Sequence, residues 1–437
     1  MRKITFIGAG SFGFTRNLVR DILTFPALAD CELALMDINP NRLKSIKKAV
    51  EQIVEAGKYP AKITATENRA EALKGADGVV ITILAAGLKV WRKDVEIPMK
   101  YGIDINIGDT RGPSGIFRYL RTAPILMDIC RDIEKYCPDA VVLNYTNPMA
   151  MLCRTMQSET GVNITGLCHS VQGTAEQIAG WLKADMKDVT FTCAGINHQA
   201  WFIDYKIKGK DAYPALREAI KNPDIYKQEI IRNQMFMHLD YYVTESSGHN
   251  SEYVAWFRKR PELIEKYCHA GTGWNDGVHG FCVQQYERQE NTWEQAIEDS
   301  LKETPNIARG HEYASYIFNG VFGDNTIYEF NGNVRNFGLI DNLPEGCCVE
   351  VPVTASKVGL RAAHVGPLPD QLALLNNISA RCEELAIKSF LAGDKHGVFQ
   401  AVAFDPLTSA VLSLDEIQQM TDEMFEANKD YLPNFKF

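Results

Sequence analysis

The most constraining feature of the sequence is a glycine-rich turn close to its start. Gly8, Gly10 and Gly13 follow the apolar run 4–7 directly, and a helical pattern continues to about residue 23. Glycine permits a tight turn and lets a pyrophosphate approach the backbone, while the helix N-terminus offers unpaired N–H groups and positive dipole charge. The pattern therefore predicts a dinucleotide-binding unit, and a purely structural strand–helix turn is the alternative.

Asp37 indicates which dinucleotide would fit. It ends the second apolar run, 32–36, and it lies 24 residues after Gly13, close to the interval expected for such a unit. A carboxylate at this point accepts hydrogen bonds from a ribose diol and repels a 2′-phosphate. We therefore expect NAD rather than NADP, with a flavin or another nucleotide as the remaining alternative.

The first half of the chain alternates short Val- and Ile-rich runs with helical patterns. After the first two runs, others lie at 62–66, 78–83, 103–107 and 141–145. Repeated β-helix-β units predict a mostly parallel, doubly wound sheet with helices on both faces. We expect an α/β protein with a Rossmann-type NAD-binding domain in residues 1–195. A mixed α+β domain in residues 196–437 is expected to serve substrate, metal and oligomer contacts.

Composition and charge exclude several other classes of protein. The chain has 46% hydrophobic and 23% charged residues, which is typical of a globular protein, and its net charge of −9 argues against a nucleic-acid-binding surface. No uninterrupted apolar stretch approaches the roughly 18–20 residues that span a bilayer. The eleven cysteines include no Cys-x-x-Cys pair, so neither a disulfide framework nor a zinc ribbon is expected. We expect a cytoplasmic protein that binds neither nucleic acid nor membrane.

Two later strings carry candidate metal ligands. Cys168 lies in Gly-Leu-Cys-His-Ser at a predicted strand end, and His198 ends the string Gly-Ile-Asn-His. Because ligands gather at the carboxyl ends of parallel strands, the two side chains could meet over one site. A thiolate and an imidazole suit a divalent transition metal and leave positions open for substrate oxygens. From the spacing alone, two packing residues are the alternative.

Several strings, in this order, resemble glycoside hydrolase family 4. They are Ile-Thr-Phe-Ile-Gly-Ala-Gly-Ser at 4–11, Asn-Tyr-Thr-Asn-Pro-Met-Ala at 144–150, the strings of Cys168 and His198, Tyr-Val-Thr-Glu-Ser-Ser at 242–247, Gly-Asn-Val-Arg-Asn at 332–336, and residues 342–351. The resemblance covers nearly the whole chain. Within the family, the sequence is most similar to the bacterial α-galactosidases of the melibiase type.

The resemblance implies an unusual glycosidase chemistry. Members use NAD and a divalent metal, usually Mn²⁺, in place of the paired carboxylates of most glycosidases. The sugar is oxidised at C3, the C2 proton is removed, the aglycone is eliminated, water adds and the hydride returns. The resemblance further implies a second domain similar to the C-terminal domain of lactate and malate dehydrogenases, and a homodimer or homotetramer.

The resemblance also assigns roles to individual residues. Cys168 and His198 match the metal ligands, and Asn147 matches the residue at the sugar's C2 and C3 hydroxyls. His169 holds the position at which phospho-sugar members have an Asp general acid, so it is the candidate acid. The candidate base is Tyr242, with Glu245 and a metal-bound hydroxide as competitors, and packing tyrosines as the plain alternative.

For other candidate residues, the sequence leaves two interpretations open. Arg335 could reach a sugar hydroxyl or form a structural salt bridge. The polar glycine loop 109–115 could lie over the cofactor or sugar, or it could only cap the helix that follows. His249 could line the pocket or act as a further metal ligand.

Several functions remain open beside the α-galactosidase. An α-glucosidase, or an α-uronidase acting on glucuronides or galacturonides, would use the same chemistry with a different pocket. A 6-phosphoglycosidase is disfavoured by His169 and by the lack of a clear phosphate clamp. A plain NAD-dependent 2-hydroxy-acid dehydrogenase is disfavoured by Cys168 and His198 in their matched strings. A non-enzymatic NAD sensor is the last alternative.

Overall fold

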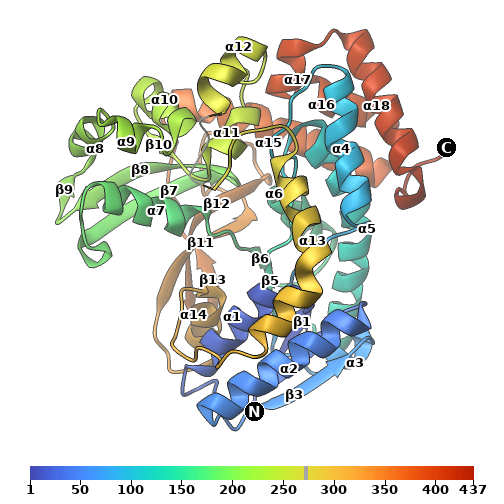
Figure 1. The fold of residues 1–437 in the computed structure, drawn as a ribbon, viewed down its shortest axis with the longest axis vertical. Coiled ribbons are helices and arrows are strands. Elements are labelled where there is room, and N and C mark those ends of the chain that lie inside the picture. Colours follow the sequence, from blue (N-terminus) through green and yellow to red (C-terminus); the bar gives the residue numbers. More distant parts are fainter. Residues whose placement is uncertain (270–273) are drawn as a thin grey trace.

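The computed structural model describes residues 1–269 and 274–437, whose strands form one continuous mixed sheet with helices on both faces (Figure 1). No helix within these ranges is both long enough and apolar enough to cross a membrane. All eleven cysteines of the sequence lie in the described ranges, and each is a free thiol.

The first part of the sheet is parallel. Its strands are β1 (Lys3–Ile7), β2 (Glu32–Met36), β3 (Lys62–Thr66), β4 (Gly78–Ile81), β5 (Val141–Asn144) and β6 (Ile164–Gly166). They lie in the spatial order β3-β2-β1-β4-β5-β6, and every neighbouring pair is parallel. This is the order of a doubly wound dinucleotide-binding sheet, so the predicted fold class is confirmed.

Helices connect these strands. They are α1 (Phe12–Leu23), α2 (Pro40–Gly57), α3 (Arg69–Leu73), α4 (Leu88–Lys100), α5 (Gly112–Tyr136), α6 (Met149–Glu159) and α7 (Ser170–Trp181). Local sequence explains where α2 begins, because the Asn39 side chain accepts hydrogen bonds from two backbone N–H groups and Pro40 fits the first helical position. α5 is a single helix although it contains Pro124.

Strand alternation places the core on both faces of the parallel sheet. Ile7, Val79 and Ile81 face a cluster that includes α4, α5 and α6, whereas Phe6 and Val80 face a cluster that includes α1 and α2. Successive strand side chains point to opposite faces, so each strand contributes to both clusters. Near-continuous apolar runs are therefore required, as the sequence has them.

Residues 103–107 do not form the strand that their Ile content predicts. The backbone N–H groups of Asn106 and Ile107 donate to Oε2 of Glu252, at 2.8 and 2.9 Å, instead of to a neighbouring strand. The N–H of Gly108 donates to Oε1 of the same carboxylate at 2.9 Å. A buried side chain thus satisfies these donors and turns the segment into the loop that leads to α5.

The second part of the sheet is antiparallel and continues from β6. Its strands are β7 (Val189–Ile196), β8 (Gln199–Ile207), β9 (Lys210–Asp211), β10 (Tyr242–Val243), β11 (Tyr328–Arg335), β12 (Cys348–Ser356) and β13 (Gly359–Ala362). The path runs β6-β11-β12-β7-β8-β10, with β9 paired to β8 and β13 to β12. The predicted domain boundary at residue 195 falls at the end of β7, which pairs with β8 and β12, and it stays a prediction.

The later helices lie beside both parts of the sheet. They are α8 (Tyr213–Ala219), α9 (Pro223–Tyr226), α10 (Ile230–Leu239), α11 (Ser247–Glu252), α12 (Pro261–Leu263), α13 (Phe281–Ser300), α14 (Tyr313–Phe322), α15 (Asp370–Ala392), α16 (Lys395–Ala403), α17 (Pro406–Val411) and α18 (Leu414–Asn428), with short helical turns at Met186–Asp188, Ile264–Cys268 and Lys429–Tyr431. The C-terminal helices, red in Figure 1, pack against α4, α5 and α6, and α14 packs against α1.

Candidate functional site

The glycine turn adopts a backbone that other residues would not tolerate. Gly8 has φ +84°, and a Cβ there would lie 1.9 Å from the carbonyl oxygen of Thr82 on the neighbouring segment. A Cβ on Gly10 would lie 2.6 Å from Oδ2 of Asp37, whereas one on Gly13 would meet nothing within 4 Å. The absence of side chains therefore lets the turn close and leaves the first turn of α1 open to an approaching group.

Asp37 braces this turn. Its Oδ2 accepts the Gly10 N–H at 2.7 Å, and its Oδ1 accepts the Asn39 N–H at 2.8 Å. Each carboxylate oxygen has a second lone pair, so Asp37 can still accept a ribose hydroxyl. The NAD-binding roles of Asp37 and of the three glycines stay predictions, and the structure places Asp37, after β2, in contact with the turn that leads into α1.

A cavity of about 450 Å³ lies beyond the carboxyl ends of β5 and β6. Six of the candidate residues line it, and they come from four separate segments of the chain: Asn147, Cys168, His169, His198, Glu245 and His249. Cys168 and His169 follow β6, His198 lies in the turn between β7 and β8, and Glu245 follows β10. The parallel and antiparallel parts of the sheet both contribute to this cavity.

Cys168, His198 and Glu245 bring three different donor atoms together. Oε2 of Glu245 lies 3.9 Å from Sγ of Cys168 and 3.9 Å from Nε2 of His198. All three donors lie within 4.8 Å of one another, a grouping that can hold one metal ion. Sulfur, imidazole nitrogen and carboxylate oxygen together suit a divalent transition metal.

Burial sets the protonation of two of these groups. It raises the pKa of the Cys168 thiol well above its ordinary value, and the nearby Glu245 and Glu350 carboxylates raise it further. Burial also lowers the pKa of His198 to about 4, and the attraction of Glu245 offsets this only in part. His198 is therefore neutral at physiological pH, as a metal ligand must be, while Cys168 has to lose a proton when it binds a metal.

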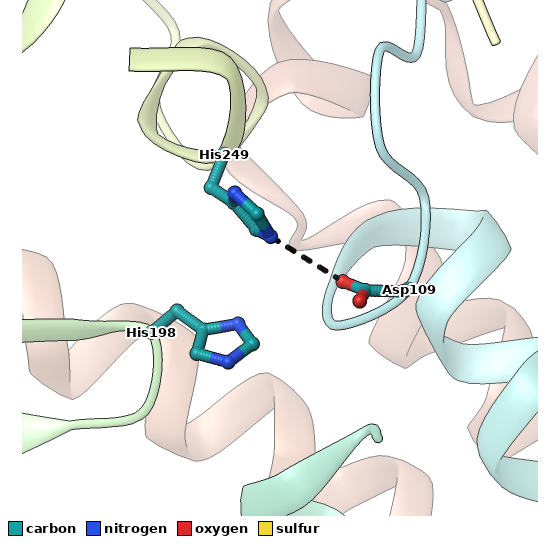
Figure 2. A group of neighbouring side chains, drawn as sticks. All are labelled: Asp109, His198 and His249. Atoms are coloured by element: carbon teal, nitrogen blue, oxygen red, sulfur yellow. Dashed lines mark ion pairs between the residues drawn. The ribbon is translucent and has the colours of Figure 1, made fainter. Parts of the chain in front are cut away.

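A second group of donors shares His198. Figure 2 shows His198 and His249 facing Asp109, with Nε2 of His249 3.8 Å from Oδ1 of Asp109. Thr110 Oγ1 lies 2.9 Å from Nδ1 of His198 and 2.7 Å from Oδ1 of Asp109. This contact orients the imidazole so that Nε2 is the nitrogen on the side of Glu245. The loop that contains Asp109 thus positions the imidazole of His198, which lies in the distant turn between β7 and β8.

The carboxylates of the site are ionised despite their burial. Burial raises the pKa of Glu245, but His249 and His198 together lower it to below its ordinary value. Burial likewise raises the pKa of Asp109, and His249, His198 and Arg118 outweigh it. Two anionic groups therefore face the imidazoles, which would favour a cation between them.

Asn147 presents a free amide oxygen. Its Nδ2 donates to Oδ2 of Asp109 at 3.1 Å, while its buried Oδ1 has no hydrogen-bond partner among the described residues. Arg118 donates from Nε to the main-chain carbonyl of Asn147 at 3.2 Å, which fixes the segment. An unpaired buried acceptor at a cavity wall is suited to a ligand hydroxyl.

His169 is the more exposed of the candidate catalytic residues. Its side chain is 51% exposed, and its Nε2 lies 2.9 Å from Oε2 of Glu312. The ring stacks on Tyr145 at a centroid distance of 5.7 Å. An imidazole oriented by a carboxylate and open to water can exchange protons with a ligand.

Two predicted residues are not brought to the cavity. Tyr242 has no exposed surface, its hydroxyl donates to Oδ1 of Asn233 at 3.0 Å, and burial raises its pKa. Arg335 donates from Nε to the carbonyl of Gly346 at 3.1 Å and lies over the ring of Phe337, beside a different cavity. The expected roles of Tyr242 as base and Arg335 as sugar contact are therefore corrected, because neither side chain lines this cavity.

The sequence also left several wall residues unrecognised. Thr174 and Gln177 reach the cavity from α7, and Glu229 and Arg232 reach it from the start of α10. Gln177 and Arg232 stand beside other polar residues of their helices, namely Glu176 and Asn233, so no local sequence signal distinguishes them from surface residues.

Models of one protein family match both parts of the chain. "Family 4 glycosyl hydrolase" matches residues 3–184, and "Family 4 glycosyl hydrolase C-terminal domain" matches residues 193–408.

Individual proteins match over most or all of their length. The chain is 39% identical to an alpha-galactosidase of Bacillus subtilis (strain 168), covering 100% of both chains. It is 36% identical to an alpha-galactosidase of Rhizobium meliloti (strain 1021), covering 99% of this chain and 89% of that one. An alpha-galacturonidase of Thermoanaerobacterium saccharolyticum is 30% identical, covering 99% of this chain and 97% of its own length.

Solved structures share the fold. A 6-phospho-alpha-glucosidase from gut microorganisms, in complex with NAD and Mn²⁺, has a TM-score of 0.83 at 20% identity and covers 100% of both chains. Malate dehydrogenase from Plasmodium falciparum has a TM-score of 0.51 at 13% identity, covering 90% of this chain and 99% of that one. The predicted likeness to the dehydrogenase fold is consistent with this second match.

Proposed function

Since the chain belongs to family 4 of the glycosyl hydrolases, we propose that it is an α-galactosidase that works with NAD and a divalent cation such as Mn²⁺. The observation that carries this proposal is the cavity in which Cys168, His198 and Glu245 place three metal-binding atoms within 4.8 Å of one another. The choice of α-galactoside is supported by the two α-galactosidases at 36% and 39% identity over nearly the whole chain.

The glycine turn and Asp37 fit NAD. A Cβ on Gly8 or Gly10 would clash with Thr82 or Asp37, so glycine lets the turn close tightly in front of the N-terminus of α1. From β1, the sheet passes through β4 and β5 to β6, which carries Cys168 at its end. Three strand spacings, about 14 Å, separate β1 from β6, and ligands of doubly wound sheets bind along this carboxyl edge of the strands. When bound, NAD supplies a reversible hydride acceptor.

Cys168, His198 and Glu245 fit a divalent cation. The donor set combines a soft sulfur with nitrogen and oxygen, and three protein donors leave positions for substrate oxygens. When bound, such a cation supplies a Lewis acid for two neighbouring sugar oxygens. In this proposal, residues 1–195 bind the dinucleotide and residues 196–437 complete the metal and substrate site.

The chain's own residues then orient the sugar and move its protons. Oδ1 of Asn147 accepts a hydroxyl at C2 or C3, because this atom is buried at the cavity wall without a partner among the described residues. Glu245 takes the proton from C2, since its carboxylate is ionised and lies beside the ligand atoms. His169, oriented by Glu312, donates a proton to the departing oxygen.

The decisive experiment measures whether the hydrogen at C2 of the sugar exchanges with solvent during turnover. Hydrolysis of p-nitrophenyl α-galactoside is expected only with both NAD and Mn²⁺ present, with no net accumulation of NADH. Deuterium placed at C2 is expected to exchange with solvent water. Activity that survives complete removal of cofactor and metal, or full retention of the deuterium, would refute the mechanism.

The proposal also includes the cellular location and the oligomeric state of the protein. A cytoplasmic location is supported by the eleven free thiols. A homodimer or homotetramer is supported by exposed apolar side chains on α15, namely Leu374 and Ile378, which are 68% and 46% exposed. Light scattering coupled to size-exclusion chromatography tests the oligomer, and a monomeric mass at micromolar concentration would contradict it.

A further inference from the structure

One permanently cationic side chain lines the cavity among the described residues, and it is Arg232 on α10. It is 2% exposed. The four remaining residues, 270–273, are Ala-Gly-Thr-Gly in sequence and bring no charged side chain. Whether this guanidinium is available to a ligand therefore determines whether the cavity offers a fixed positive charge to a sugar.

Every nitrogen of the Arg232 guanidinium already has a protein acceptor. Nε donates to Oε2 of Glu229 at 2.9 Å, and Nη2 lies 2.8 Å from Oε1 of the same carboxylate. Nη1 donates to Oγ1 of Thr174 at 2.9 Å, and Nη2 also donates to Oε1 of Gln177. By contrast, Arg118 has a buried Nη1 without a partner among the described residues.

Glu229 is held as firmly as its partner. It is 4% exposed, and its Oε2 accepts the N–H and the hydroxyl of Ser247, both at 2.8 Å, beside Nε of Arg232. The bidentate pair is thus locked between α10 and the start of α11. Its two charges cancel, and the cavity wall there presents a neutral surface.

The ion pair lines the same cavity as the donor group, from other elements of the fold. In a pyranose, the C2–C3 edge lies across the ring from C5, which carries C6. If the C2 and C3 oxygens lie at Cys168 and His198, as the proposed function requires, C6 points away from them. The wall formed by Thr174, Gln177 and Arg232 is the part of the cavity contributed by α7 and α10.

We propose that Glu229 determines specificity by occupying Arg232, so that the site accepts sugars with a neutral C6 and rejects those with a C6 carboxylate or phosphate. The inference rests on the proposed function, and it adds the residue that separates galactosides from galacturonides and 6-phosphates. Two sugars of otherwise equal shape are discriminated by one charge, because a buried carboxylate without a cation is strongly disfavoured.

The test is Glu229→Gln in the holoenzyme, with D-galactose and D-galacturonate as paired competitive inhibitors. Glutamine keeps the shape of the Glu229 side chain but carries no charge, so the guanidinium of Arg232 becomes available to an anion. The ratio of inhibition constants is expected to move toward galacturonate by about 10- to 100-fold, the range for a charged hydrogen bond. Hydrolysis of p-nitrophenyl α-galacturonide is expected to rise relative to the galactoside.

A matched control uses a second ion pair away from the cavity. Arg154 on α6 pairs with Glu384 on α15 at 2.7 Å, and their side chains are 13% and 16% exposed. Glu384→Gln makes the same chemical change and is expected to leave the galactose-to-galacturonate ratio unaltered. The double variant Glu229→Gln/Arg232→Met is expected to lose the gain, because the cation itself is gone.

If Glu229→Gln does not fold, a milder variant tests the same inference. Gln177 is only partly buried, and Gln177→Ala frees one Nη2 donor of Arg232 while leaving Glu229 in place. A smaller shift in the same direction is expected. An unchanged ratio in folded Glu229→Gln, or in Gln177→Ala when only that variant folds, overturns the inference. Calorimetric titration of the two sugars gives the same ratio without turnover, so a wild type inactive on α-galactosides would count against the proposed function alone.

Discussion

Glu350 lies on β12 with no exposed surface, and few hydrogen bonds compensate for the burial of its carboxyl group. Nδ2 of Asn197 approaches Oε2 at 3.4 Å, while Oε1 has no partner among the described residues. Burial raises the pKa of Glu350 from 4.5 to about 7, and repulsion from Glu245 adds to the effect. The folded protein therefore binds a proton at Glu350 over a pH range in which the unfolded chain has released it.

This difference costs stability as the pH rises. The folded state binds more protons between pH 4.5 and 7, so the free energy of unfolding falls through that window and levels off above it. A shift of 2.5 pH units corresponds to about 3.4 kcal/mol in full, of which about 2.5 kcal/mol develops between pH 5 and 8.5. Glu350→Gln cannot titrate, so the variant should gain that amount relative to wild type over this range.

Thermal unfolding measures the gain. At about 2.1 cal/mol/K per residue, a chain of 437 residues has an unfolding entropy of about 0.9 kcal/mol/K. The difference in Tm between Glu350→Gln and wild type should therefore grow by about 3 °C from pH 5 to pH 8.5. Glu345→Gln, at an exposed position just before β12, is the control and should give no pH-dependent difference. A Tm difference for Glu350→Gln that is the same at both pH values would refute the reasoning.

Three further predictions concern the proposed site. Cys168→Ser should weaken Mn²⁺ binding measured by calorimetry. In the wild type, the affinity for Mn²⁺ should rise about tenfold per pH unit from pH 6 to 8, because the thiol must release its proton to bind the ion. A Mn²⁺ affinity that does not depend on pH would argue against a thiolate ligand. Glu245→Gln should lower kcat by at least about 100-fold and should also weaken Mn²⁺ binding, because a carboxylate of the donor group becomes a neutral amide. A kcat close to the wild-type value at saturating Mn²⁺ would argue against Glu245 as the base. Asp37→Ala should weaken NAD binding by about 10- to 100-fold, measured by fluorescence titration, and should reduce the ratio of NAD affinity to NADP affinity. An unchanged affinity for NAD would show that Asp37 does not contact the ribose.

The parallel half of the fold was accessible from local sequence patterns. Short apolar runs and intervening helices predicted a doubly wound sheet, and the glycine turn predicted the strand–helix unit at its start. The exception, residues 103–107, has the right composition for a strand, but Glu252 provides acceptors for its backbone N–H groups. Such a contact joins residues about 145 positions apart, so no local pattern reports it.

Of the candidate residues in the matched strings, Asn147, Cys168 and His198 lie at one cavity, whereas Tyr242 and Arg335 lie elsewhere. Cys168 and His198 meet in the cavity as expected, because each follows a strand that ends at the same edge of the sheet. Tyr242 and Glu245 lie only three residues apart, yet Tyr242 faces a packed cluster and Glu245 faces the cavity. Alternation along a strand and the turn after it decide this, and a matched string does not fix the direction of each side chain.

By itself, the sequence determined the features that depend on neighbouring residues. Gly8 and Gly10 are required wherever this turn forms, and the order of apolar runs imposes a parallel sheet with helices on both faces. Which distant groups meet depends on the tertiary fold: His249 with Asp109, Thr110 with His198, and Gln177 with Arg232 beside the cavity. The reason is physical, since backbone conformation is set by local sterics, whereas the charge and hydrogen bonding of a buried side chain depend on whatever the packed chain places within a few ångströms of it.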